Sequence, residues 1–331
     1  MPSLKEIKGR INSISSTLAI TSAMKMVAAA KLQKAQMAIQ NMLPYERRLY
    51  SMLLDLMGAM NISAAASEDG SVRGSGSAER GFDQSGDRLS LSNRHDLAGM
   101  DGAYSLMAQR EVRKVAIVAF ASNSSLCGAF NSNVIREATA VINEYCASGL
   151  GDADITVYSV GRKMAEAMKK LGFPSPADFT KMSDSPSYDA ASALAQELFD
   201  GFVSGRFDKV ELVYNHYKST SSQPTTRQTY LPLSLADATA DIQVGKITDS
   251  ASEPYADKVA EPVVRQNSPT TETPDLIVEP SKEELIATLL PKVVRLRVFT
   301  TLLDSTAAEH AARTVAMQLA TDNGNDLLQE L

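Results

Sequence analysis

A stripe of apolar residues runs through the first sixty residues at the spacing of one face of an α-helix. Counting alternately three and four residues from Leu4 gives these positions: Ile7, Ile11, Ile14, Leu18, Thr21, Lys25, Ala28, Leu32, Ala35, Ile39, Met42, Glu46, Leu49, Leu53, Leu56 and Met60. Only Thr21, Lys25 and Glu46 among them are polar. This pattern, sustained over many heptads, predicts a coiled-coil helix that lies along a partner of similar length. At about 1.5 Å per residue, the helix would be roughly 85 Å long, which exceeds the diameter of a small domain.

The partner is predicted in the same chain, in a second long helix near the C-terminus. Ser281 and Glu284 fit a capping box, with the serine covering a free backbone N–H and the glutamate reaching back. The short helix that starts there is expected to break near Pro291, and a long helix is expected to follow to about Thr321 or beyond. Alanines recur in both terminal helices: Ala28, Ala29, Ala30, Ala307, Ala308, Ala311, Ala312 and Ala316. Because small side chains allow helix axes to approach toward the lower end of about 8–10 Å, we expect an antiparallel pair.

Between the two helices, short apolar runs alternate with helical patterns. Val115–Ala121 is a continuous apolar run, which is typical of a strand buried on both faces. The other expected elements are strands at Ile155–Val160 and Val210–Tyr214 and helices from about Gly128 to Cys146, at Arg162–Leu171 and at Ala190–Val203. Strand and helix in alternation predict a Rossmann-like α/β domain with a mainly parallel sheet. The predicted fold is therefore α/β, a long antiparallel coiled coil of N- and C-terminal helices with this domain inserted.

Composition divides the chain into five segments. They are 1–60 (N-terminal coiled-coil helix), 61–105 (flexible insertion), 106–218 (α/β domain), 219–280 (extended loop) and 281–331 (C-terminal coiled-coil helix). The second segment is rich in Gly, Ser, Asp and Arg, and the fourth holds seven of the thirteen prolines. Thr229–Leu233 could still form an edge strand within the fourth segment.

Charge is distributed unevenly. Residues 1–48 hold eight basic and two acidic side chains, whereas the whole chain carries a net charge of −6. A basic helix in an acidic protein indicates an acidic protein partner, although a merely solvated helix face would give the same pattern. Nucleic-acid binding is not expected, because the basic residues come without interleaved aromatics. No apolar run approaches the roughly 18 residues that span a membrane, so any membrane association is expected through partners.

The residues that usually carry chemistry are sparse. Two cysteines, Cys127 and Cys146, are too few for a disulfide framework, and we expect both to be buried and reduced. They and the three scattered histidines form no metal-ligand spacing, so neither a metal nor a cofactor is expected. The chain also has no G-x-x-x-x-G-K-[ST] phosphate loop and no G-x-S-x-G elbow. A thiol nucleophile at Cys127 is one alternative, but it would need a nearby base, and no histidine is close in sequence.

Three segments of the sequence resemble the gamma subunit of F-type ATP synthase. The first is Ile20–Lys31, followed by Pro44-Tyr45. The second is Leu126-Cys127-Gly128 with Asn131, and the third is Ala308–Gly324. The resemblance implies a central-stalk rotor that performs no chemistry and couples proton-driven rotation of a membrane ring to conformational changes in the catalytic beta subunits. The alternative is an unrelated coiled-coil scaffold protein, which would share helical periodicity but not these residue identities.

The resemblance also implies partners, a location and contact residues. The partners would be the alpha and beta subunits of the catalytic hexamer, the epsilon subunit and the membrane c-ring, at the cytoplasmic face of a bacterial inner membrane. Met24 and Lys25, together with Glu309 and Arg313, would face acidic loops of the beta subunits. Exposed ion pairs are worth only about 0–1 kcal/mol, which suits a contact that must be made and broken. Simple packing of Met24 against the second helix is an equally good interpretation.

The sequence departs from the family pattern in three places, of which one is the pair of insertions at 61–105 and 219–280, longer than in many relatives. The family usually has an aspartate and a basic residue before Gly-Leu-Cys-Gly, whereas Asn123-Ser124-Ser125 precede Leu126 here. A salt bridge made by those side chains is therefore not expected. The family also continues for several helical turns beyond the position of Leu331, so we expect either a C-terminal fragment or a short shaft.

Overall fold

The computed structural model describes residues 4–59, 106, 110–233, 278–279 and 281–331. The predicted insertion at 61–105 lies outside the described residues. The same is true of residues 234–277 within the predicted loop at 219–280. The chain forms two compact units. The first comprises residues 1–48, 106–234 and 292–331, and the second comprises 49–105 and 235–291.

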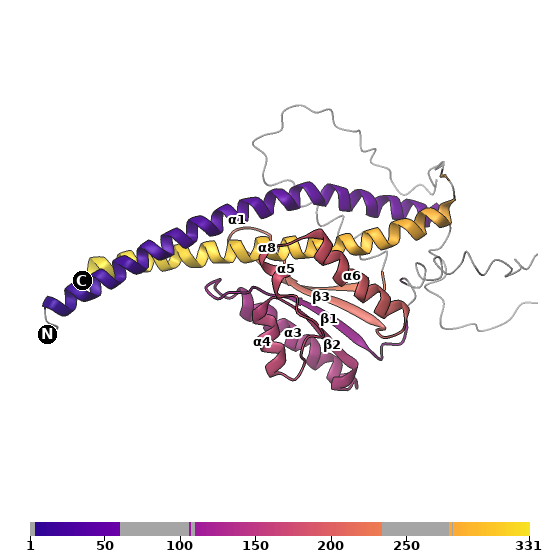
Figure 1. The fold of residues 1–331 in the computed structure, drawn as a ribbon, viewed down its shortest axis with the longest axis horizontal. Helices are drawn as coiled ribbons and strands as arrows, with labels where there is room; N and C mark the ends of the chain where they lie inside the picture. Colours follow the sequence, from indigo (N-terminus) through magenta and orange to yellow (C-terminus); the bar gives the residue numbers. More distant parts are fainter. Residues whose placement is uncertain (1–3, 60–105, 107–109, 234–277, 280) are drawn as a thin grey trace, which may run out of the picture. The chain divides into compact units, whose positions relative to one another are not determined.

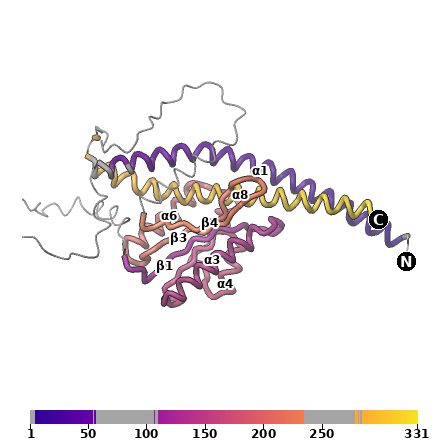
Figure 2. The backbone as a smooth tube through the Cα atoms, turned by 180° about the vertical axis from the view of Figure 1, so that it is seen from behind, coloured from indigo at the N-terminus to yellow at the C-terminus, as the bar shows by residue number. Residues whose placement is uncertain are grey.

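Two long helices form the ends of the chain. Helix α1 spans Leu4–Ala59 and helix α8 spans Lys282–Glu330. In the first unit they lie side by side in opposite directions (Figures 1 and 2). Residues 4–48 of α1 and 292–330 of α8 are called the shaft below.

The expected helix break near Pro291 is wrong, because α8 runs through this proline without interruption. Proline inside a helix costs about 3 kcal/mol. Leu290, Val293 and Val294 beside it are almost completely buried, and each buried aliphatic side chain contributes about 1.5–3 kcal/mol. Burial of these neighbours therefore outweighs the lost hydrogen bond. At the start of α8, the backbone N–H of Glu284 donates to Ser281 Oγ at 3.1 Å, which is the serine half of the expected capping box.

Polar contacts define the register of the shaft. Thr321 Oγ1 donates to Thr21 Oγ1 at 3.1 Å, and Arg297 Nη1 lies 3.3 Å from Glu46 Oε1. In an antiparallel pair of helices, the numbers of two facing residues add up to a constant, and here that sum is 342 or 343. Between these contacts, an apolar cluster joins the two helices: Leu32, Ala35, Ala307 and Ala311. Two of the three polar interruptions of the N-terminal stripe thus meet polar partners on α8, and the predicted antiparallel coiled coil is confirmed.

The inserted domain is built on a four-stranded sheet. Its strands are β1 (Val115–Phe120), β2 (Ile155–Val160), β3 (Lys209–Asn215) and β4 (Thr225–Leu231), in the order β2-β1-β3-β4. β1 pairs in parallel with both β2 and β3, whereas β4 pairs antiparallel with β3. The predicted edge strand therefore exists, but it starts at Thr225 because pairing with β3 begins there, opposite Asn215.

Helices cover both faces of this sheet (Figure 1). The helices between the strands are α3 (Phe130–Ala147), α4 (Arg162–Lys170), α5 (Thr180–Asp184) and α6 (Tyr188–Val203), with a 3₁₀ turn at Asp152–Asp154. Val115, Ile117 and Ala119 of β1 point into a core shared with α3 and α4. α6 covers the other face. The mixed α/β fold with a mainly parallel sheet is confirmed.

Candidate functional site

The loop that follows β1 is where the α/β domain meets α8. Leu126 has a φ of +68° and Gly128 a φ of +57°, so the chain turns sharply at the Leu-Cys-Gly motif. Asn131 at the start of α3 closes this turn. Its side-chain oxygen accepts a hydrogen bond from the Ser122 backbone N–H at 3.0 Å, and its nitrogen donates to the Ser124 carbonyl at 3.1 Å. The motif thus builds a rigid corner at the carboxyl end of β1.

Cys127 is a packing residue of this corner. Its side chain is buried and belongs to an apolar cluster with Phe130 and Ala308. Its sulfur lies 3.2 Å from Asn131 Nδ2, and the hydrogen-bonding neighbours that the described residues give it include no histidine. None of these neighbours is a histidine that could act as a base for the thiol. Cys127 is buried as expected, whereas Cys146 is only partly buried.

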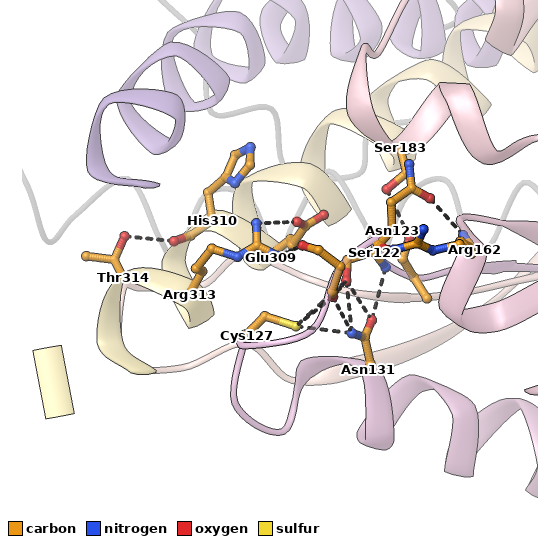
Figure 3. A network of polar contacts seen from close by, with 12 residues as sticks. Ser122, Asn123, Cys127, Asn131, Arg162, Ser183, Glu309, His310, Arg313 and Thr314 are labelled. Carbon is orange, nitrogen blue, oxygen red and sulfur yellow. Dashed lines mark hydrogen bonds and ion pairs between the residues drawn. The ribbon is translucent and has the colours of Figure 1, made fainter. Parts of the chain in front are cut away.

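Asn123 connects the same loop to α4 (Figure 3). Its side-chain oxygen accepts from the Arg162 backbone N–H at 2.7 Å, and its nitrogen donates to the Thr180 carbonyl at 2.7 Å. The Arg162 guanidinium in turn donates to the Asn123 carbonyl at 2.6 Å. An ionised aspartate could accept the first of these bonds but could not donate the second. The neutral amide of Asn123 therefore uses both its acceptor and its donor in these contacts.

Arg313 connects the loop to α8. One guanidinium nitrogen lies 2.7 Å from Glu309 Oε1, and the other donates to Ser124 Oγ at 2.7 Å (Figure 3). The Arg313 and Glu309 side chains are only 12% and 9% exposed. The structure thus brings these two predicted contact residues together, but it buries them against their own chain. The sequence pattern gave no signal for Ser124, because its partner lies 189 residues away.

Charges of both signs lie around this ion pair. Burial raises the pKa of the Glu309 carboxyl, the nearby Asp184 acts in the same direction, and Arg313 and Lys31 oppose them. Burial, together with the charges of Arg313 and Lys31, lowers the pKa of His310 to about 4. His310 is therefore neutral near pH 7, and none of the described residues forms a hydrogen bond with its buried Nδ1.

Met24 and Lys25 lie on α1 and are partly exposed. The register of the shaft places Lys25 level with Met317 and Gln318, about one helical turn from the level of Arg313. Three apolar side chains close to them in sequence are more than half exposed: Ile20, Met26 and Val27. Large apolar groups that stay in contact with water on a helix without a partner on that side indicate an interaction surface.

Among the described residues, no group of three or more His, Cys, Asp or Glu side chains is placed to hold a metal ion. In the same part of the chain, none of the helices combines the length and the apolar character that a membrane span requires.

Comparison with known proteins identifies the family. A model of the ATP synthase family matches residues 3–331. An ATP synthase gamma chain from Phocaeicola vulgatus is 46% identical over 331 residues, which are 100% of this chain and 91% of that relative. One from Bacteroides thetaiotaomicron is 43% identical and is covered to 92% of its length. This chain belongs to the ATP synthase gamma-chain family. The predicted family is confirmed, and the alternative of an unrelated scaffold finds no support.

Solved structures of ATP synthases resemble this gamma-chain family member more distantly. The central stalk and c-ring structure of the Tetrahymena thermophila mitochondrial ATP synthase contains a chain with 18% identity and a TM-score of 0.47, with 91% of this chain and 99% of that chain covered. For the rotor of the Euglena gracilis mitochondrial enzyme the identity is 18% and the TM-score 0.48, with coverage of 98% and 93%.

Proposed function

We propose that this gamma chain performs no chemistry and transmits rotation between a membrane ring and a catalytic hexamer. Its partners are then the alpha, beta and epsilon subunits and the c-ring, and the complex holds it at the cytoplasmic face of a bacterial inner membrane. No nucleic acid is involved. The observation that carries this proposal is the single antiparallel register of the shaft, which Thr21–Thr321 and Glu46–Arg297 fix at two separated levels. Polar pairs between the facing sides of two helices specify register in coiled coils.

The contact with the beta subunits is assigned to the level of the shaft that carries Met24, Lys25, Glu309 and Arg313. Met24 and Lys25, with the exposed apolar residues beside them, supply the surface that touches the partner. Glu309 and Arg313 act from behind that surface, because their ion pair is buried and holds the Ser124 loop to α8. A partly exposed lysine gains little from each ion pair, so the contact is made and broken easily.

Reversing the charge of Lys25 tests this assignment. In the assembled synthase, Lys25→Glu is expected to lower the ratio of ATP made to protons moved, while the chain still assembles at one copy per hexamer. Lys170→Glu is the matched control, since Lys170 is exposed at the end of α4 and far along the chain from this level. A coupling ratio that is unchanged in both variants would contradict the assignment.

Arg313 needs a different substitution because it is buried against Glu309. A glutamate there would place two carboxylates together in a buried site and would destabilise the fold itself. Arg313→Gln keeps a donor that can reach Ser124 and leaves Glu309 free to take up a proton. We expect this variant to assemble with a reduced coupling ratio; full coupling would show that the Arg313 guanidinium has no part in the contact.

A further inference from the structure

The loop after β3 touches both helices of the shaft at one level. Asp304 of α8 receives two contacts from this loop: its Oδ2 lies 2.6 Å from His216 Nδ1, and its Oδ1 accepts from the Tyr217 backbone N–H at 2.8 Å. The Asp304 side chain is 17% exposed, so water competes little for it. Gln36 Nε2 of α1 lies 2.6 Å from the Tyr217 hydroxyl oxygen. One tyrosine thus joins α1, α8 and the α/β domain.

Tyr217 also packs between two apolar clusters. One cluster lies between the helices of the shaft and includes Leu32 and Ala311. The other joins α8 to the corner after β1 and includes Cys127 and Ala308. The register places Gln36 opposite residues 306–307, which is within one helical turn of Asp304. The polar contacts and the ring therefore act at the same level of the shaft.

The apolar surface of α8 at this level would by itself resist rotation of the helix only weakly. Ala307, Ala308 and Ala311 are completely buried there, and Ala312 is partly buried. Small side chains permit close approach but form low ridges, and apolar contact is not directional. A torque about the axis of α8 would be resisted weakly by such a surface. A carboxylate held at both oxygens by a loop resists it strongly, because charge-assisted hydrogen bonds lose energy steeply when their geometry changes.

We propose that Asp304, His216 and Tyr217 form a clasp that fixes the shaft to the α/β domain and carries the torque between them. The proposal rests on the rotor function and names positioning residues for it. Asp304 holds α8, and the Tyr217 hydroxyl holds α1 through Gln36. The clasp matters most when the rotor turns against a load.

Rotation under two loads tests the clasp. The chain is assembled with the alpha–beta hexamer, and a small or a large probe is fixed to an introduced cysteine at Lys170 of the α/β domain. With Asp304→Ala we expect wild-type speed for the small probe and slower, interrupted rotation for the large one. Tyr217→Phe removes only the hydroxyl and should give the same load dependence to a smaller degree. Thr139→Val is the control, because it removes a side-chain hydrogen bond within α3 and leaves both the clasp and the register of the shaft intact.

Hydrogen exchange shows independently whether the clasp has opened. Losing a hydrogen bond to a charged group should raise the exchange rate of the Tyr217 amide by about tenfold or more in Asp304→Ala. Variants that follow the wild type at both loads, or that slow equally at both loads, would overturn the clasp, since the second result indicates a merely structural role. A wild-type chain that hydrolyses ATP in the complex without turning either probe would overturn the rotor function together with the clasp.

Discussion

Replacing Arg297 with methionine is expected to cost about 2–4 kcal/mol in the free energy of unfolding at pH 7. Methionine keeps most of the length and apolar volume of the arginine stem, so the change removes mainly the charge. The Arg297 guanidinium lies 3.3 Å from the Glu46 carboxylate, and the two side chains are 17% and 7% exposed. The variant therefore removes the Arg297 cation from beside a buried carboxylate.

The size of this cost has an upper limit that depends on pH. Removing one partner of a buried pair typically costs about 3–5 kcal/mol. Protonation of Glu46 would remove the cost of the buried charge. For a glutamate with its ordinary pKa, protonation costs about 3.7 kcal/mol at pH 7 and about 1 kcal/mol at pH 5. The other contacts of Glu46 reduce the cost further. Because a protonated Glu46 brings no charge into the buried site, the lost stability should grow as pH rises from 5 to 7.

Urea unfolding followed by circular dichroism at both pH values measures this effect. Glu46→Leu leaves a buried guanidinium, which cannot lose its proton, so its penalty should be the same at pH 5 and pH 7. The double variant Glu46→Leu with Arg297→Met should regain most of the lost stability, because neither charge is then buried alone. A loss below about 1 kcal/mol for Arg297→Met at pH 7, or an equal loss at both pH values, would refute the reasoning.

Further substitutions test the packing and the electrostatics of the fold. Because the pKa of His310 falls to about 4 on folding, its protonation should reduce the stability of the fold as pH falls from about 6.5 toward 4. The loss should be at most about 1.4 kcal/mol per pH unit. His310→Gln should remove this part of the acid sensitivity, as measured by urea unfolding. In Gly161→Ala the new Cβ would lie 2.1 Å from the Ala121 carbonyl oxygen, whereas in Gly172→Ala it would meet nothing within 4 Å at nearly the same positive φ. Thermal unfolding should therefore show a loss of about 1–2 kcal/mol for Gly172→Ala and a clearly larger loss for Gly161→Ala. Ala311→Leu should cost about 1–3 kcal/mol by overfilling the closest part of the shaft, whereas Ala30→Leu on the exposed side of α1 should be nearly neutral, and similar values for the two would contradict the assigned faces.

The long-range order of this fold was largely predictable from local pattern. The stripe from Ala28 to Leu56 and the run at Val115 identify buried faces, because helices and buried strands impose strong periodicity on apolar residues. Pro291 was misjudged because its local preference for a break is overcome by burial of its neighbours, which the sequence does not display. β4 starts at Thr225 rather than Thr229 because its pairing with β3, a long-range contact, begins there.

The candidate site was only partly predictable. Family resemblance pointed to Glu309 and Arg313, but it did not predict that Arg313 donates to Ser124, which is distant in sequence. The roles of Asn123 and Tyr217 could not be predicted, because an amide or a phenol gives no signal of which backbone group or helix it will meet across the fold. Contacts of this kind are set by tertiary packing rather than by local propensity.

Rotation of the α/β domain during ATP hydrolysis is the most direct test of the central claim. The alpha–beta hexamer is fixed to a surface, the wild-type sequence with Lys170→Cys carries the probe, and ATP is supplied. We predict that the probe turns continuously in one direction while ATP is consumed, because the shaft and the α/β domain move as one body. Sustained hydrolysis by complexes that contain this chain, with a probe that stays still, would contradict the account.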